Sequence, residues 1–204
     1  MLSKEQIAMN KQAYIDLLKS IKREGADIEG LIKKLETSDF FTAPASTQYH
    51  SSYEGGLCDH SLNVYEKLVM LVNNCYPDNN PYSNETLIIV ALLHDLSKMN
   101  FYEVAERNVK DANGNWTKVP FIKTREAKDR FIYASHGVNS EYMTGRFIPL
   151  SIEESAAIIH HMGGKEAGAP VFDGAITEVF NRFSLSILLH TADMLATFID
   201  ERLI

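Results

Sequence analysis

Residues 84–98 read NETLIIVALLHDLSK, and this stretch predicts the buried centre of a helical protein. Ser83 is a typical helix-capping residue, and residues 87–93 are all apolar. A helix that is apolar on every side is buried, because no face of it prefers water. The helix ends at His94 and Asp95, an imidazole and a carboxylate that are costly to bury unless a metal ion compensates them.

Hydrophobic periodicity predicts further helices on both sides of this stretch. The first begins at Ser3, which has capping-box spacing with Gln6, and a second begins at Asp27. The remaining helices are predicted over 57–76, over 136–146, from Ser151 to the HHMGG segment, and from Asp173 or Ser184 to the carboxyl end.

Residues 101–123 have a different pattern. Two alternating segments flank Asn113 and Gly114, a dipeptide typical of tight hairpin turns. We therefore predict an all-α helical bundle with a small β-hairpin inserted at 101–123. The chain is expected to form a single domain over 1–204, whose N-terminal helices occupy 1–37.

Composition restricts the classes of function. Of the 204 residues 45% are hydrophobic and 23% charged, and the formal net charge is −7. Long duplex DNA is not expected as a partner, because it requires a basic face. Residues 107–130 are a local exception with a net charge of +4, typical either of a solvated hairpin or of a flap that steers an anionic substrate. No apolar run approaches the roughly 20 residues that span a bilayer, so we expect a cytoplasmic protein without a membrane partner.

The histidines and two aspartates are the candidate ligands of a metal. All seven histidines follow the first two predicted helices, and most of them lie at the ends of apolar helices. Asp193 lies within the apolar run LLHTADMLATF without a basic residue one helical turn away, so it requires a distant partner. His60, near the start of its own helix, supplies a nitrogen ligand that can converge with these residues in a bundle.

These residues resemble the pattern of the HD superfamily of metal-dependent phosphohydrolases. That pattern is a histidine, a His-Asp pair and a distant aspartate on successive helices, here His60, His94 with Asp95, and Asp193. The segments YEGGLCDHSLNV and ALLHDLSK are similar to the family in their apolar context as well. The tail segments IIHHMGGKEAGAP and LLHTADMLATF resemble the HD domain of a bacterial 3′ to 5′ exoribonuclease, and the chain also resembles uncharacterised bacteriophage HD-domain proteins.

The resemblance further implies a binuclear site. His136 and the pair His160 and His161 match the additional histidines that hold a second metal in some members, with Asp95 as the bridging, catalytic ligand. Adjacent helical residues point about 100° apart, so His160 and His161 do not approach one ion equally; we rank His160 first. The implied cofactors are two divalent transition metals (Mn, Fe, Ni, Co or Zn), with Mg as an alternative at one site.

Several residues are predicted around the metals. Lys98, three residues after Asp95, resembles the lysine of the family that contacts the substrate phosphate, although a lysine facing solvent remains the alternative. His50 and Tyr53 are predicted to bind substrate, with Tyr49 as an alternative stacking surface. His190, one turn before Asp193, is predicted to orient a ligand through a hydrogen bond.

The resemblance implies hydrolysis of a phosphoester or phosphodiester in a nucleotide or short oligonucleotide by a metal-activated hydroxide. Two alternatives use the same ligands: a mixed-valent diiron oxygenase, and a nucleotide-binding module without turnover. Sequence spacing does not separate them, and the oligomeric state stays open.

Overall fold

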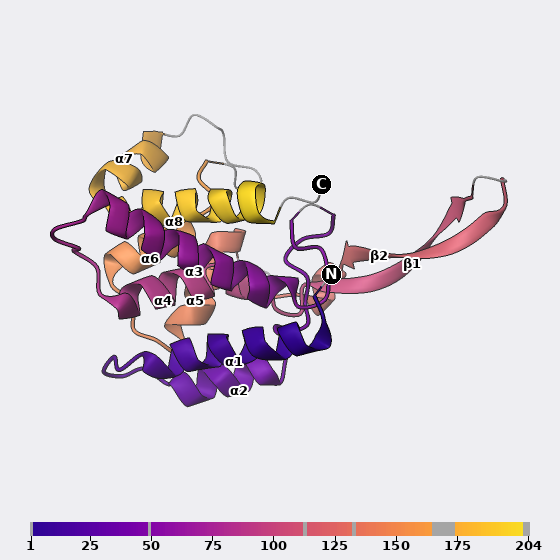
Figure 1. Ribbon diagram of the computed structural model, residues 1–204, viewed down its shortest axis with the longest axis horizontal. Helices are drawn as coiled ribbons and strands as arrows, with labels where there is room; N and C mark the ends of the chain where they lie inside the picture. Colours follow the sequence, from indigo (N-terminus) through magenta and orange to yellow (C-terminus); the bar gives the residue numbers. More distant parts are fainter. Residues whose placement is uncertain (1, 49, 112–113, 132–133, 165–173, 202–204) are drawn as a thin grey trace.

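The chain forms a helical bundle from which a two-stranded arm extends (Figure 1). The computed structural model describes residues 2–48, 50–111, 114–131, 134–164 and 174–201. In this part of the chain the structure contains eight α-helices and two strands. The helices are α1 (Lys4–Ser20), α2 (Ile28–Glu36), α3 (Gly56–Cys75), α4 (Asn84–Leu93), α5 (His136–Gly145), α6 (Ile152–Ile159), α7 (Gly174–Arg182) and α8 (Ser184–Leu195), and the strands are β1 (Tyr102–Lys110) and β2 (Trp116–Thr124).

Helix α4 is the buried centre of the bundle, as predicted. Every residue from Leu87 to Leu93 is at most 3% exposed. One side of α4, including Ile89 and Leu93, packs in a hydrophobic cluster with α1 and α2. Its other side, including Val90, packs in a second cluster with α3, α6 and α8. Because α4 lies between two apolar clusters, His94 at its carboxyl end lies in the middle of the molecule.

The predicted helix caps are present, with one difference. The Ser151 hydroxyl accepts the Glu154 backbone N–H while the Glu154 carboxylate accepts the N–H of Ser151, which completes a capping box. At α1 the Ser3 hydroxyl accepts the Gln6 N–H, but the Gln6 amide donates to Asn10 (2.8 Å). Only half of the box expected at Ser3 therefore forms, because Asn10 offers the Gln6 side chain another acceptor.

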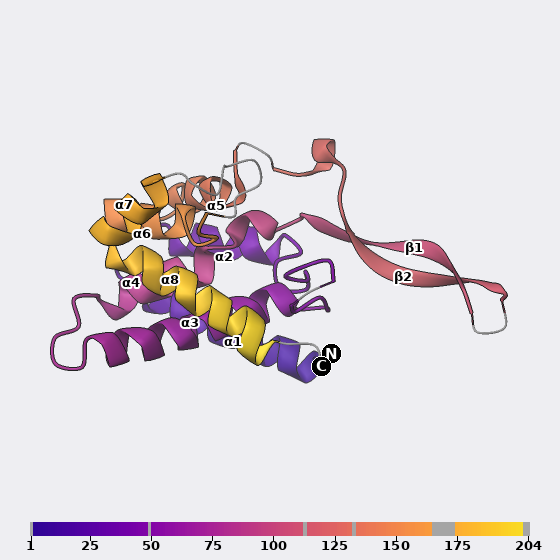
Figure 2. The ribbon, with the colours of Figure 1, turned by 90° about the horizontal axis from the view of Figure 1, so that it is seen from above.

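The inserted hairpin is confirmed, with β1 and β2 antiparallel and paired from Tyr102 opposite Thr124 to Lys110 opposite Trp116. Gly114 has φ +83°, a left-handed conformation that suits the predicted turn, whereas Asn113 lies outside the described residues. Figure 2 shows the hairpin extending well beyond the helices, and its Val104 and Trp116 side chains are 74% and 68% exposed.

The carboxyl-terminal region contains two helices that break at Phe183, so both of the predicted helix starts are close to an observed one. Helix α8 continues into the π-helical turn Ala196–Asp200. Among the described residues no single helix is long and apolar enough to cross a membrane, although the bent pair Ile176–Arg182 and Ser184–Asp200 meets that test when taken together.

Candidate metal centre

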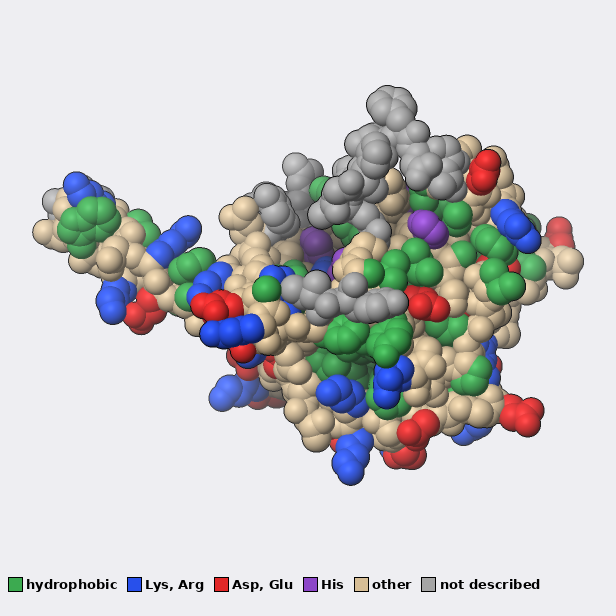
Figure 3. Space-filling view, turned by 180° about the vertical axis from the view of Figure 1, so that it is seen from behind, with side chains coloured by type: hydrophobic (Ala, Val, Ile, Leu, Met, Phe, Trp, Pro, Cys, Tyr) green, Lys and Arg blue, Asp and Glu red, His purple; other side chains and the backbone are tan. Residues whose placement is uncertain are grey.

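Five helices bring histidines and aspartates to one buried point in the bundle. His60 comes from α3, His94 and Asp95 from the end of α4, His136 from α5, His161 from the turn after α6, and Asp193 from α8. His60, His94, Asp95 and His161 are at most 2% exposed, and Asp193 is 8% exposed. Figure 3 shows histidine side chains in a recess on one face of the molecule.

Asp95 lies between two groups of histidines. Its Oδ2 atom is 3.5 Å from His94 Nε2 and 3.7 Å from His60 Nε2. Its Oδ1 atom is 2.5 Å from His136 Nε2 and 3.5 Å from His161 Nε2. The two oxygens of this one carboxylate thus lie nearest to different pairs of imidazoles.

The first group also contains Asp193. The Nε2 atom of His60 lies 3.3 Å from His94 Nε2 and 3.3 Å from Asp193 Oδ1. These ligand atoms all lie within 4.8 Å of one another, as do those of His94, Asp95 and His161. Ligands about 2.0–2.2 Å from a divalent ion are separated by distances of this order. The donor set therefore fits a cation.

Hydrogen bonds donated by the Nδ1–H groups fix the orientation of two imidazole rings and the protonation of their Nε2 atoms. The Nδ1–H of His94 donates to the Ala91 carbonyl (2.8 Å), and that of His161 donates to the Ile158 carbonyl (2.7 Å). A carbonyl only accepts, so each Nδ1 carries the proton and each Nε2 keeps its lone pair for a metal. In the described part of the chain His161 Nε2 is buried without a hydrogen-bond partner, as expected of a ligand atom.

Glu201 completes the site and was missed by the sequence analysis. Its carboxylate is 3.0 Å from His60 Nδ1, accepts the Ser51 hydroxyl (2.7 Å) and accepts the Asn63 amide (3.0 Å). Glu201 therefore holds the proton on Nδ1 and turns Nε2 toward Asp193, an outer contact typical of metal-binding histidines. Its sequence context, an acid after an apolar helix near the carboxyl end, gives no signal that separates it from a solvent-facing residue.

Burial and charge shift the pKa values of this group. Burial lowers the pKa of His94 to about 3. Burial also acts to lower the pKa of His60, but hydrogen bonds to Asp193 and Glu201 outweigh it and raise the pKa to about 10. Burial would raise the pKa of Asp95, yet the positive charge of Lys98 holds it well below its usual range. A positive charge is thus favoured between these carboxylates, which a metal ion supplies on binding.

Lys98 and His50 extend from the ligands into a cavity. The Lys98 ammonium is 2.6 Å from Asp95 Oδ2, and its side chain is 14% exposed. The His50 ring packs 4.9 Å from the His60 ring, and burial lowers its pKa to about 4. Both line a cavity of about 370 Å³, together with Asp95, Met162, His190, Asp193, Met194, Thr197 and Phe198.

Two predicted residues, His160 and Tyr53, do not line up with the ligand cluster. His160 is in none of the metal-binding groups that the described residues form, because α6 ends at Ile159 and His160 becomes its C-cap. Of the two adjacent histidines, His161 is the one that joins such a group. Tyr53 does not line this cavity; its hydroxyl donates to Asp59 (2.6 Å). Tyr49 lies outside the described residues.

The His190 side chain contacts the backbone of the turn that carries His161. Its Nδ1–H donates to the His161 carbonyl (2.6 Å), and its ring stacks on Phe180 with 5.8 Å between centroids. A Cβ on Gly163 would lie 2.9 Å from the His190 ring, so Gly163 permits this close approach. His190 thus positions the turn that carries His161 and also lines the cavity.

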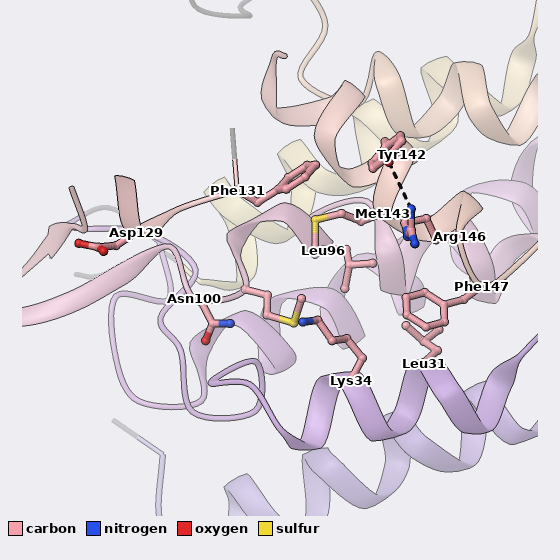
Figure 4. A pocket seen from close by; sticks show the side chains of 11 residues that line it. Leu31, Lys34, Leu96, Asn100, Asp129, Phe131, Tyr142, Met143, Arg146 and Phe147 are labelled. Atoms are coloured by element: carbon pink, nitrogen blue, oxygen red, sulfur yellow. Dashed lines mark hydrogen bonds between the residues drawn. The ribbon is translucent and has the colours of Figure 1, made fainter. Parts of the chain in front are cut away.

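A separate cavity of about 380 Å³ lies beside the turn Leu96–Lys98 (Figure 4). Leu31, Leu96 and Phe147 form part of its apolar wall, and its lining contains no histidine. This cavity therefore lacks the imidazole nitrogens that the ligand cluster offers to a metal.

Comparisons with known protein families, with curated proteins and with solved structures found no match. The functional interpretation therefore rests on the geometry of the site.

Proposed function

We propose that this protein is a metal-dependent phosphohydrolase of the HD superfamily, which cleaves a phosphoester or phosphodiester of a nucleotide or short oligonucleotide. The observation that supports it best is the position of Asp95, whose two oxygens face two separate groups of histidines. This favours two divalent transition metals, one held by His60, His94 and Asp193 and one by His136 and His161, with Asp95 common to both. When bound, such metals ionise water near neutral pH and offset negative charge on a phosphoryl group.

The protein residues around the metals have separate roles in this proposal. Lys98 presents a buried cation to the cavity beside Asp95, where it would bind a phosphoryl oxygen of the substrate. Its contact with Asp95 also places that cation on the Oδ2 side of the bridging carboxylate. His50 lines the same cavity, and its lowered pKa favours the neutral imidazole, which can accept or donate one hydrogen bond.

Part of the cavity lining is apolar. Met162, Met194 and Phe198 line the cavity, and they offer a surface on which the base of a nucleotide can pack. The combination of metal-binding groups, the Lys98 cation and apolar side chains in one cavity favours a substrate that has both a phosphate and a planar group. The cavity volume of about 370 Å³ is within the usual range of small-molecule sites.

The adjacent histidines His160 and His161 provide a matched test of two metals. We would measure metal content and Mn²⁺-dependent cleavage of a chromogenic phosphodiester in the wild type, His161→Ala and His160→Ala. We expect two metals per chain in the wild type and in His160→Ala, and one in His161→Ala with most activity lost. Two retained metals in His161→Ala would contradict the proposed second site.

The same preparations separate the alternative functions. A diiron oxygenase would contain iron, consume oxygen and leave the phosphodiester intact under every metal condition. A nucleotide-binding module would bind nucleotides without cleavage. Either result would overturn the proposed hydrolase.

A further inference from the structure

In the part of the chain that the structure describes, the hairpin arm joins the bundle at its base, and no other helix or strand packs on its outer part (Figures 1 and 2). At the base, the Arg125 guanidinium donates to the Tyr102 carbonyl (2.7 Å) and to Asp39 Oδ2 (3.2 Å). A two-stranded hairpin is marginally stable in water when isolated, and it gains stability by packing against something else. The exposed apolar side chains of this arm therefore indicate a binding surface.

Cations lie over aromatic rings near the outer end of the arm. Lys110 and Trp116 are directly opposite one another, and the Lys110 ammonium is 5.2 Å from the centre of the indole ring. On the other face the Arg107 guanidinium is 5.4 Å from the centre of the Phe121 ring. Among the described residues neither cation has a carboxylate within ion-pair distance. Both charges are consequently available to an anionic partner.

The charge of this region differs from that of the rest of the chain. Residues 107–119 contain Arg107, Lys110 and Lys118 but a single acid, Asp111, which gives a net charge of +2. The whole chain carries −7, so the remaining residues carry −9. The Asp111 carboxylate also accepts the Asn115 N–H (2.9 Å) within the turn. A polyanion would thus be attracted to the arm and repelled by most of the bundle.

The arm also follows residues of the candidate metal centre directly in the chain. The Phe101 N–H donates to the Lys98 carbonyl (3.1 Å), so β1 begins directly after the turn that carries Asp95 and Lys98. Tyr102, the first residue of β1, also lies close enough to Lys98 and Asp95 for their charges to act on its hydroxyl group. Stacking of bases on exposed aromatic rings, combined with cations along the backbone, is the usual way of binding single-stranded nucleic acid.

We propose that the arm binds single-stranded nucleic acid and directs one end of the strand to the metal centre. This inference rests on the proposed function for the substrate class, and it adds a binding surface outside the cavity. A second copy of the chain fits the arm less well, because the unpaired cations of two arms would repel one another in a symmetric pairing.

Trp116 allows a direct test, because it is the only tryptophan of the chain. We would titrate the metal-loaded protein with a 12-nucleotide single strand whose phosphorothioate linkages slow cleavage, and record tryptophan fluorescence. The strand should quench the fluorescence, whereas a mononucleotide should not. Absence of quenching by the strand would overturn the proposal.

Variants would then be compared by the anisotropy of a labelled strand. Trp116→Ala should weaken binding at least about fivefold, because stacking stabilises each base by 1–3 kcal/mol. The double variant Arg107→Glu/Lys110→Glu should lower the slope of log affinity against log salt by about 1.4, as expected for two lost phosphate contacts. Lys19→Glu/Lys33→Glu is the control, since it changes the net charge equally at exposed positions on α1 and α2. Equal binding by the two double variants would contradict the proposal.

The outcomes also separate this proposal from the proposed function. Arm variants should cleave the small phosphodiester at the wild-type rate, because none of the substituted residues lines the cavity. If the wild type cleaves that diester but does not bind the strand, the arm proposal is wrong and the hydrolase stands. If the strand binds without cleavage of any phosphoester, the hydrolase is wrong. Fluorescence that changes with protein concentration, with dimers in sedimentation velocity, would instead assign the arm to self-association.

Discussion

The metal-ligand cluster and the hairpin arm hold polar side chains under opposite physical conditions. In the cluster, Asp95, His60, His94 and His161 are buried, and His136 is 28% exposed. Each has a defined partner or lies beside a ligand atom. On the arm, Lys118 and Glu106 form an ion pair at 3.2 Å while 70% and 63% exposed. Removal of one polar group should therefore reduce metal binding or stability strongly in the buried region and only slightly on the arm, because water replaces a lost partner only at the surface.

The largest effect is expected from Asp95→Asn. Asparagine keeps the size of the side chain but provides a neutral amide and one oxygen, so it cannot serve both histidine groups as an anion. We expect a lower metal content and a loss of about a thousandfold or more in kcat, since such interactions contribute several kcal/mol to the transition state. Metal analysis and phosphodiester cleavage would measure these effects. Asp16→Asn, at an exposed position of α1, is the control. Wild-type activity of Asp95→Asn would refute the role of the carboxylate.

The next largest effect concerns a buried ion pair away from the metals. The Arg23 guanidinium donates two hydrogen bonds, of 2.6 and 2.8 Å, to Glu154, which is 1% exposed. Arg23→Ala removes the cationic partner of this buried carboxylate, which keeps its hydrogen bond from the Ser151 N–H, and it also breaks the ion pair of Arg23 with Glu85 (3.3 Å). We therefore expect a loss of about 2–3 kcal/mol in the free energy of unfolding, measured in urea. Lys11→Ala breaks the exposed pair with Glu36 (2.8 Å) and should cost less than about 1 kcal/mol.

The pH dependence of this pair sharpens the test. Burial would raise the pKa of Glu154, but the hydrogen bonds from Arg23 and from the Ser151 backbone lower it below the unfolded value of 4.5. A lowered folded pKa stabilises the fold above the unfolded pKa, and this stabilisation is lost as the pH falls through the folded pKa. The difference in the free energy of unfolding between wild type and Arg23→Ala should therefore be constant at neutral pH and become smaller below about pH 4.5. A constant difference down to pH 2 would contradict this account.

A smaller effect is expected from Glu201→Gln. The amide keeps the shape of the side chain but weakens the hold on His60 Nδ1, so metal affinity should fall about 10- to 100-fold. Asp200→Asn makes the equivalent change one residue earlier, where the carboxylate pairs with Lys67 (2.8 Å) instead of a ligand. Competition with a metal chelator would measure both affinities. Equal affinities in the two variants would show that Glu201 does not orient His60.

Much of the site was predictable because buried polar groups in apolar sequence require partners. His94 and Asp95 follow a fully apolar helix, and Asp193 interrupts another, so their convergence followed from the cost of leaving them unpaired. The bundle and the hairpin were predictable for a similar reason, since apolar periodicity and the Asn113-Gly114 turn act over a few residues.

The details that sequence did not predict depend on the exact ends of elements and on long-range contacts. His161 instead of His160 joins a ligand group because α6 ends at Ile159, and a shift of one residue at a helix end changes which side chain points inward. Glu201 reaches His60 across 141 positions through a π-helical turn, a geometry without a local sequence signal. The Tyr53 hydroxyl bonds to Asp59, six residues away, a contact that the sequence did not predict.

The smallest effect is expected on the arm, from Lys118→Gln. This substitution removes the exposed ion pair with Glu106, and we expect the free energy of unfolding to change by less than about 0.5 kcal/mol in urea. Metal content and cleavage of a small phosphodiester should also stay unchanged, whereas binding of a single strand should weaken because one cation is lost. Lys118→Gln would therefore separate binding from stability. A large loss of stability would instead show that the arm belongs to the cooperative core, and its exposed residues would then be constrained by folding rather than by a partner.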